Sequence, residues 1–124
     1  MPRATVNGSR QRPNDPPILI LTSLAGGPKH GHALSKDIEG FAGVVLGPGA
    51  LYGAITRLEE RGLIEPLESN DRRRPYRITA TGWVYLAEAV DEMQRLADEG
   101  ARRLAVAKRV LVPRRGPRIA GSPT

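Results

Sequence analysis

The chain has 124 residues, enough for one domain with tails. Its 19 lysines and arginines outnumber the 13 acidic residues, and the formal net charge of +6 favours a polyanionic partner. The absence of cysteine excludes a disulfide framework, thiolate chemistry and a zinc finger, and it fits a cytoplasmic protein.

The positive charge lies mainly at the two ends of the chain. Residues 1–15 carry a net charge of +2 and residues 113–124 carry +3, which leaves +1 for residues 16–112. Both ends are rich in Pro, Gly, Ser and Arg, so we predict a disordered basic tail at 1–15 and another at 113–124. The net charge is therefore not evidence of a DNA-binding core, although basic tails would add salt-sensitive attraction to DNA.

The first expected helix is Pro16–Leu24, which is largely apolar. Asp15 is a suitable N-cap, Pro16 is tolerated in the first turn, and Gly26-Gly27-Pro28 breaks the helix. The apolar run also resembles the core of a signal peptide, but it is very short for that role. No segment approaches the ~20 apolar residues of a membrane span, so no membrane partner is expected.

A second helix is expected at about Gly31–Glu39, ended by Gly40. His30 and His32 at its start are residue types that often bind metals. Residues two apart lie on different faces of a helix, and no Cys or nearby carboxylate pair completes a ligand set, so we predict no metal and no cofactor. His30 is instead expected to pack against the second helix or cap it.

The third expected helix is the most informative element. Leu51, Ile55 and Leu58 follow the 3.6-residue period of one helix face. Pro48 suits the first turn and Gly62 suits the left-handed position beyond the last turn, so the helix should be about 13 residues long.

The other face of this helix carries mostly small residues with one aromatic and one cation: Gly49, Ala50, Tyr52, Gly53, Thr56 and Arg57. Solvated helix faces are usually rich in Lys and Glu instead. Small residues near the N-terminus let the backbone approach a partner, as when a recognition helix enters the major groove of DNA with phosphates near its amides.

A β-hairpin is expected next, with strands at Ile64–Glu68 and Pro75–Thr79 around a turn at Ser69–Asp71. Prolines at positions 66 and 75 cannot donate to a ladder, so both strands should have an open edge. Three consecutive arginines at 72–74 occupy the tip, with Arg77 just behind. Such a run can be a solvated surface, but its position after a small-faced helix indicates the basic wing of a DNA-binding domain.

The last expected helix runs from an N-cap at Thr79 to about Val112. Its apolar seam has the alternating four- and three-residue spacing of a coiled coil. The seam residues are Leu86, Val90, Met93, Ala97, Gly100, Leu104, Ala107 and Leu111. Such a helix would be about 50 Å long, more than so small a core can cover. We therefore favour a homodimer over a helix that folds back on its own core.

Trp83 and Tyr85 lie at the start of this last helix. They could line an effector pocket, but core packing of Trp83 under the wing is favoured, because aromatic side chains mainly supply buried area. No aromatic residue follows Tyr85 in the helix. A small-molecule effector of unknown identity is an open alternative.

These segments resemble the PadR-like transcriptional regulators over roughly residues 16–100. The matching pieces are I-L-I-L-T-S-L in the first helix, H-G-H-A-L-S-K-D-I at 30–38, P-G-A-L-Y-G-A-I-T-R-L-E-E-R-G-L-I at 48–64 and R-R-P-Y-R-I-T-A-T-G at 73–82. The resemblance implies a winged helix that binds palindromic operators as a homodimer, usually as a repressor, with the last helix pairing the subunits. His32 departs from the family pattern, as do Ala50 and Gly53, whose small size weakens direct base readout.

The predicted fold is mainly α with a small β-hairpin: a winged helix-turn-helix DNA-binding domain at 16–80 and a C-terminal dimerisation helix at 81–112. The predicted function is a sequence-specific repressor with double-stranded DNA and a second copy of the chain as partners. Enzymatic activity is not expected, because there is no cysteine and no Ser–Asp or carboxylate constellation accompanies the two histidines. The expected DNA contacts are Lys36, Gly49, Ala50, Tyr52, Gly53, Thr56, Arg57, Arg72, Arg73, Arg74 and Tyr76. The alternative is a winged-helix adaptor for protein interaction or dimerisation that does not read DNA sequence.

Overall fold

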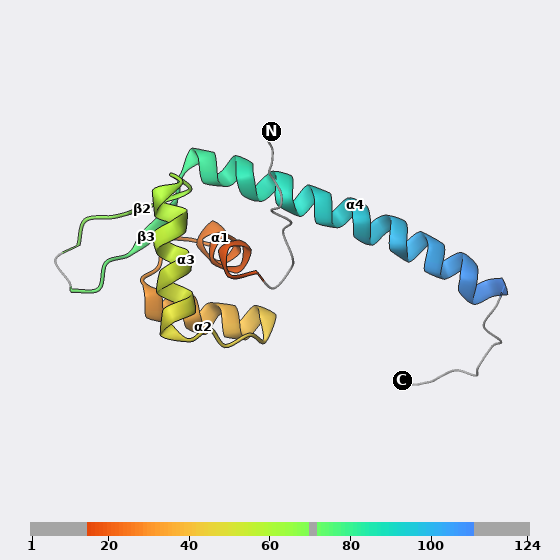
Figure 1. Ribbon diagram of the computed structural model, residues 1–124, viewed down its shortest axis with the longest axis horizontal. Coiled ribbons are helices and arrows are strands. Elements are labelled where there is room, and N and C mark those ends of the chain that lie inside the picture. The colour runs from red at the N-terminus through yellow and green to blue at the C-terminus, as the bar shows by residue number, and fades with distance from the viewer. Residues whose placement is uncertain (1–14, 70–71, 111–124) are drawn as a thin grey trace. The chain divides into compact units, whose positions relative to one another are not determined.

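The computed structural model describes residues 15–69 and 72–110. Three helices come first: α1 at Pro16–Ala25, α2 at Gly31–Ala42 and α3 at Pro48–Glu60 (Figure 1). The antiparallel strands β2 at Ile64–Pro66 and β3 at Tyr76–Ile78 follow, and then α4 at Ala80–Val110. The predicted mainly α fold with one hairpin is confirmed. The chain divides into two units after Met93, and the predicted basic tails lie outside the described residues except for Asp15.

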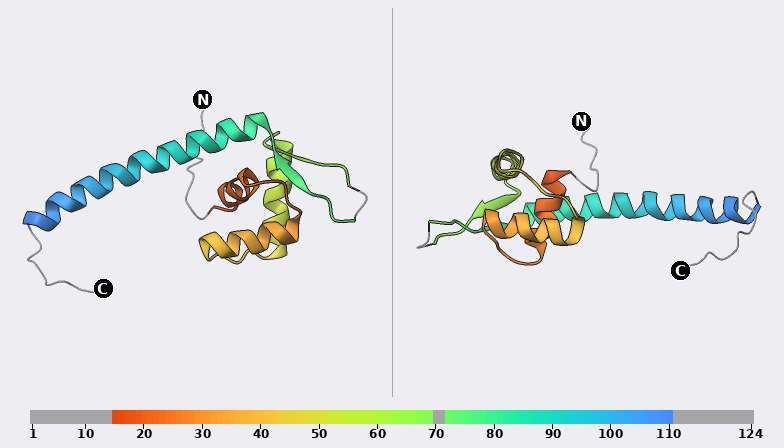
Figure 2. Two further views of the ribbon diagram at one scale, coloured as in Figure 1. Left: turned by 180° about the vertical axis from the view of Figure 1, so that it is seen from behind. Right: turned by 90° about the horizontal axis from the view of Figure 1, so that it is seen from below.

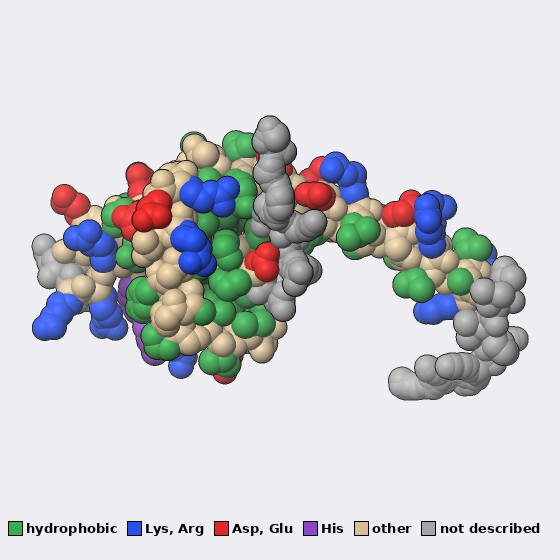
Figure 3. All heavy atoms as spheres, in the orientation of Figure 1, with side chains coloured by type: hydrophobic (Ala, Val, Ile, Leu, Met, Phe, Trp, Pro, Cys, Tyr) green, Lys and Arg blue, Asp and Glu red, His purple; other side chains and the backbone are tan. Residues whose placement is uncertain are grey.

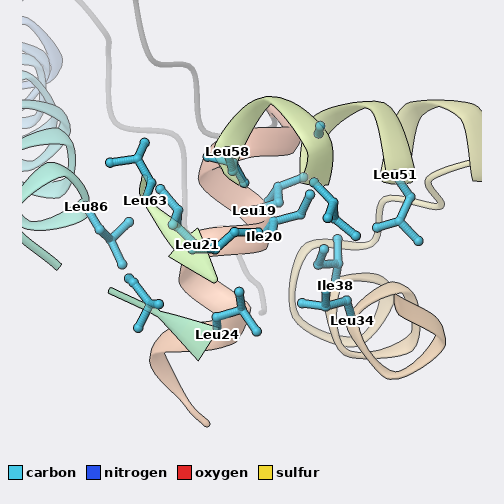
Figure 4. Close-up of a cluster of buried hydrophobic side chains, with 14 residues drawn as sticks. Leu19, Ile20, Leu21, Leu24, Leu34, Ile38, Leu51, Leu58, Leu63 and Leu86 are labelled. Atoms are coloured by element: carbon cyan, nitrogen blue, oxygen red, sulfur yellow. The ribbon is translucent and has the colours of Figure 1, made fainter. Parts of the chain in front are cut away.

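The first unit is built around a core of aliphatic side chains from the three short helices, the hairpin and the start of α4 (Figure 4). α1 is central, because it packs against α2, α3 and β3. Its residues Ile18–Leu21 are all buried, so α1 is apolar on nearly all sides rather than along one stripe. The expected apolar face of α3 is confirmed, since Leu51, Ile55 and Leu58 are buried in the same core.

Glycines end α2 and α3. The prediction that Gly40 ends α2 was wrong, because this glycine stays helical at a cost of only about 1 kcal/mol. The chain turns at Gly43 instead, which has a left-handed φ of 69° and donates its N–H to the Glu39 carbonyl. α3 has the expected length of 13 residues, and Gly62 beyond it has the expected left-handed φ, 74°.

The hairpin leaves from the C-terminal end of α3 (Figure 2). Ile64 pairs with Ile78, and Pro66 pairs with Tyr76. Both strands are shorter than expected. The predicted open edge is wrong for β3, because the backbone of Tyr76 donates to the Lys29 carbonyl at 2.9 Å and accepts from the Lys29 N–H at 3.1 Å. This single bridge joins the base of the wing to the loop between α1 and α2.

The start of α4 is fixed against the hairpin. Thr79 is the N-cap, as predicted: its Oγ1 accepts from the Gly82 N–H at 3.0 Å and donates to the Gly62 carbonyl at 2.7 Å. A Cβ on Gly82 would overlap the Leu63 carbonyl oxygen and lie 2.7 Å from a side-chain carbon of Ile78. The backbone of α4 therefore touches the backbone of Leu63, just before β2, with no side chain between them.

The helical phase set at Gly82 decides which side chains of α4 enter the core. Leu86 and Ala89 follow on the same face and are buried. Trp83 is on another face and is 48% exposed, so the predicted core packing of this residue was wrong.

Residues 94–110 form the second unit, which is helical throughout. Its polar contacts include pairs three or four residues apart: Gln94 Nε2 donates to Asp98 Oδ1 at 2.8 Å, and Glu99 is paired with Arg102 and Arg103. Such pairs each stabilise a helix by about 0.2–0.5 kcal/mol. Among the helices of the described ranges, none is long and apolar enough to cross a membrane.

Candidate DNA interface

The exposed face of α3 is nearly free of large side chains in its first two turns. Gly49 and Ala50 are exposed, and Gly53 is half-buried. Thr56 and Arg57 are exposed on the same side, opposite the buried face. The structure therefore brings together the six predicted recognition residues on one helix, with Tyr52 at the edge of the face.

Tyr52 reaches from α3 to the start of α2. The residue is 50% exposed, and a Cβ on Gly31 would lie 2.7 Å from its Cζ and 2.9 Å from its Cε1. Real Cβ atoms do not approach other atoms so closely, so the ring occupies the space that any side chain at position 31 would need. The hydroxyl is thereby held beside the N-terminus of α2, where backbone amides and the helix dipole favour an anion.

His30 caps that same helix end. Its Nδ1 accepts from the Ala33 N–H at 3.3 Å, which confirms the expected capping role. The rings of His30 and His32 are stacked, with centroids 6.5 Å apart. They can lie on the same side because His30 precedes the helix, so the helical rotation between residues does not fix its direction. In the part of the chain that the structure describes, no group of three His, Cys, Asp or Glu could hold a metal ion.

All four arginines of the wing are exposed to solvent. Arg72, Arg73 and Arg74 are exposed and have no ion pair with any other described residue. On the face of the molecule that Figure 3 shows, Lys and Arg side chains gather around the hairpin. Arg77 differs, because its Nε donates to Glu65 Oε2 across the two strands at 2.7 Å. Lys36 of α2 is also exposed and without an ion pair in the described ranges.

Tyr76 connects the wing to the end of α3. It is half-buried in β3 and packs against the core. Burial raises its pKa above the ordinary value of 10.0, the neighbouring Glu59 and Tyr52 raise it further, and Arg74 acts in the opposite direction. The hydroxyl is therefore protonated at neutral pH and can donate a hydrogen bond.

Lys29, which the sequence analysis did not single out, holds the loop between α1 and α2. Its Nζ donates to the carbonyls of Ser23 at 2.6 Å and Gly27 at 3.1 Å. Ser23 is buried and donates its Oγ to Asp37 Oδ2 at 2.6 Å, and Lys29 Nζ lies 3.9 Å from the same oxygen. With the backbone bridge to Tyr76, these contacts fix the end of α1, the middle of α2 and the base of the wing together.

The predicted dimer seam on α4 needs one correction and one addition. Leu86 belongs to the core of its own chain, where it is not available to a second copy. Val90 and Leu104 are exposed. The sequence analysis missed Leu96, which is 75% exposed beside the seam. Of the remaining positions, Ala97 is exposed, Met93, Gly100 and Ala107 are half-buried, and Leu111 lies outside the described residues.

Comparison with known proteins identifies a family. Residues 20–88 match the transcriptional regulator PadR-like family. A curated relative, the uncharacterized 37.1 kDa protein in transposon TN4556 of Streptomyces fradiae, is 45% identical over 86 residues, which is 69% of this chain. The chain spans only 25% of the length of that relative.

Solved structures share the fold. A PadR family transcription regulator from hypervirulent Clostridium difficile R20291 is similar with a TM-score of 0.65 and 24% identity, over 72% of this chain and 97% of that one. F93 from STIV, a winged-helix DNA-binding protein, is similar with a TM-score of 0.59 and 20% identity, over 64% and 87% of the two chains. Because the family match covers more than half of the sequence, including α2, α3 and the hairpin, the chain belongs to the PadR-like family of transcriptional regulators and has a winged-helix DNA-binding fold.

Proposed function

We propose that the protein is a sequence-specific repressor that binds a palindromic operator as a homodimer. The observation that carries this proposal is the combination of three exposed wing arginines, unpaired among the described residues, with a helix whose exposed face is made of small residues. A helix that enters the major groove must bring its backbone close to the base pairs, which small residues allow. A face that only meets solvent has no such requirement.

In the proposed complex, α3 lies in the major groove with Gly49, Ala50 and Gly53 toward the base pairs. The hydroxyls of Tyr52 and Tyr76 donate to phosphates at the edge of the groove. The remaining contacts come from Lys36, Thr56, Arg57, Arg72, Arg73 and Arg74. The three wing arginines neutralise phosphates or enter the adjacent minor groove.

The second copy is held by α4 in this proposal. Leu96 and Leu104 expose apolar surface, and full burial of a leucine contributes about 1.5–3 kcal/mol. The seam would run from Val90 onward, with Ala97 and Gly100 small enough for two helices to approach closely. A two-fold dimer would place its recognition helices about 34–36 Å apart, one turn of DNA. A dimer bound within a promoter would repress by excluding polymerase.

Selection of bound sites from random DNA duplexes by the purified protein tests the function. We expect a consensus of two half-sites related by two-fold symmetry, separated by about one helical turn. No enrichment over nonspecific DNA would contradict the proposal and favour the alternative of a dimerisation adaptor.

Salt dependence tests the wing. We expect Arg73→Ala to weaken binding to all duplexes and to lower the slope of log affinity against log salt by about 0.9 for each phosphate that the variant no longer neutralises. Arg77→Ala is the matched control, because Arg77 is already paired with Glu65 in the same hairpin. Equal slopes for wild type and Arg73→Ala would show that Arg73 neutralises no phosphate and would contradict a role of the wing in the interface.

A further inference from the structure

Arg57 is exposed on α3, one turn after Gly53. A Cβ built on Gly53 would lie 3.6 Å from Arg57 Nη1, so the guanidinium lies over the glycine one turn before it. Helical side chains lean toward the N-terminus, which gives this direction a physical cause. The absence of a side chain at 53 leaves the space that the guanidinium occupies. The N–H groups of the guanidinium therefore lie beside the small residues of the preceding turn, although Arg57 itself belongs to the third turn of the helix.

The neighbours of Arg57 on this face have little with which to read a base. Gly49, Ala50 and Gly53 have no side-chain donor or acceptor. The hydroxyl hydrogen of Thr56 is engaged by the Tyr52 carbonyl at 2.9 Å. Tyr52 itself is turned toward Gly31 at the start of α2. The guanidinium of Arg57 therefore provides most of the side-chain hydrogen-bond donors on this face.

Among the described residues Arg57 is also unpaired, although a carboxylate is near in sequence. Glu60 is three residues further on the same helix, but no ion pair joins Arg57 to any residue of the described ranges. Arg61, one turn beyond, is occupied differently, since its guanidinium carbon lies 5.0 Å from the centroid of the Tyr85 ring. The two arginines therefore have different environments: one faces the proposed groove, and the other packs on α4.

We propose that Arg57 is the residue that specifies sequence, by reading a guanine in each half-site through hydrogen bonds to O6 and N7. The planar fork of arginine matches these two acceptors, which only guanine presents together in the major groove. The small residues before Arg57 allow the helix to approach the base pairs closely, and the wing arginines bind the phosphates. This inference rests on the proposed function, because it assigns the base readout within the same interface.

Site selection with the full chain and its Arg57→Ala, Arg57→Lys and Arg61→Ala variants tests the inference. The wild-type and Arg61→Ala consensus should share a guanine in each half-site. Arg57→Ala should lose the preference at that position alone, and Arg57→Lys, which keeps the charge but not the planar fork, should weaken it. Wild type should bind the consensus about 5- to 150-fold more tightly than a duplex in which that base pair is replaced. This ratio should fall to near onefold in Arg57→Ala and to an intermediate value in Arg57→Lys. Arg57 is exposed, so all variants should fold, which thermal melting checks.

A probe on the DNA separates base reading from charge. Replacing the selected guanine by 7-deazaguanine removes the N7 acceptor, and it should weaken wild type several-fold while leaving Arg57→Ala unchanged. If Arg57→Ala instead weakens all duplexes equally and lowers the salt slope, Arg57 is a phosphate ligand and the inference is overturned, although the proposed function stands. If wild type selects no consensus, the proposed function fails as well.

Discussion

The two units of the chain hold their side chains in different ways. In residues 15–93 the large apolar residues of α1 are all buried, and polar groups such as Ser23 and Thr79 bond to distant positions in the sequence. In residues 94–110 the pairs around Glu99 join neighbours on one helix, and Leu104 is exposed. The difference teaches that the first unit contains its own packing partners. In the described part of the second unit, Leu96 and Leu104 stay exposed, and only the proposed second copy of the chain would bury them.

Two leucine truncations give the sharpest form of this comparison. Leu34 is 0% exposed and Leu104 is 63% exposed. We expect Leu34→Ala to lower the free energy of unfolding by about 2–5 kcal/mol, because it leaves a cavity in the core. Leu104→Ala should change it by less than about 0.5 kcal/mol in dilute protein. Urea denaturation measures both.

Sedimentation at rising protein concentration completes that test. Leu104→Ala should weaken self-association, while its unfolding in dilute protein stays close to wild type. If Leu104→Ala lowered the free energy of unfolding in dilute protein as much as Leu34→Ala does, Leu104 would have a core contact within its own chain. The contrast between the two units would then disappear.

Two glycines of α4 should respond to alanine with opposite signs. Gly82→Ala should cost about 1–3 kcal/mol of unfolding free energy, because the new methyl group would overlap the backbone of Leu63. A Cβ on Gly100 meets no other atom within 4 Å. Gly100→Ala should therefore stabilise the helix by up to about 1 kcal/mol.

Circular dichroism during thermal unfolding checks this pair in dilute protein. Stabilisation by Gly82→Ala would contradict the close contact between α4 and the hairpin. If Gly100→Ala stabilises the dilute protein but weakens self-association, it supports close approach of a second helix there.

A third pair of substitutions compares a helix cap with a surface ion pair. Thr79→Ala removes the hydroxyl that joins Gly82 to the Gly62 carbonyl, and it should cost about 0.5–2 kcal/mol. Glu99→Ala removes its pairs with Arg102 and Arg103, which are exposed, and it should cost less than about 1 kcal/mol. Chemical denaturation at low and high salt distinguishes them. Only the Glu99→Ala effect should shrink with salt, and a salt-sensitive Thr79→Ala effect would contradict the capping role.

The helices were predictable because proline and glycine mark their ends. Pro48 and Gly62 bound α3 correctly, since each acts through its own backbone conformation. Gly40 shows the limit of this reasoning. A glycine is only weakly unfavourable inside a helix, and the position of the turn at Gly43 depends on how the loop rejoins the core.

The contacts that assemble the site could not be predicted in the same way. The bridge between Lys29 and Tyr76 uses backbone groups, which leave no pattern of side chains. The contact between the Tyr52 ring and Gly31 forms only when α2 and α3 pack together. Trp83 was misplaced for a related reason, because periodicity gives the spacing of a helix face but not which face meets the core. The arginine tip was predictable because it is local in sequence.

In the proposed complex, the bridge at Tyr76 would also affect the entropy of DNA binding. Ordering the backbone of one residue costs about 1–2 kcal/mol. Arg74 is adjacent to Pro75, whose carbonyl accepts from the Leu67 N–H at 2.8 Å, and it lies two residues before the anchored Tyr76. The folded chain has therefore already restricted Arg74 before any DNA is present. Of the three tip arginines, Arg74 should lose the least conformational freedom on reaching a phosphate.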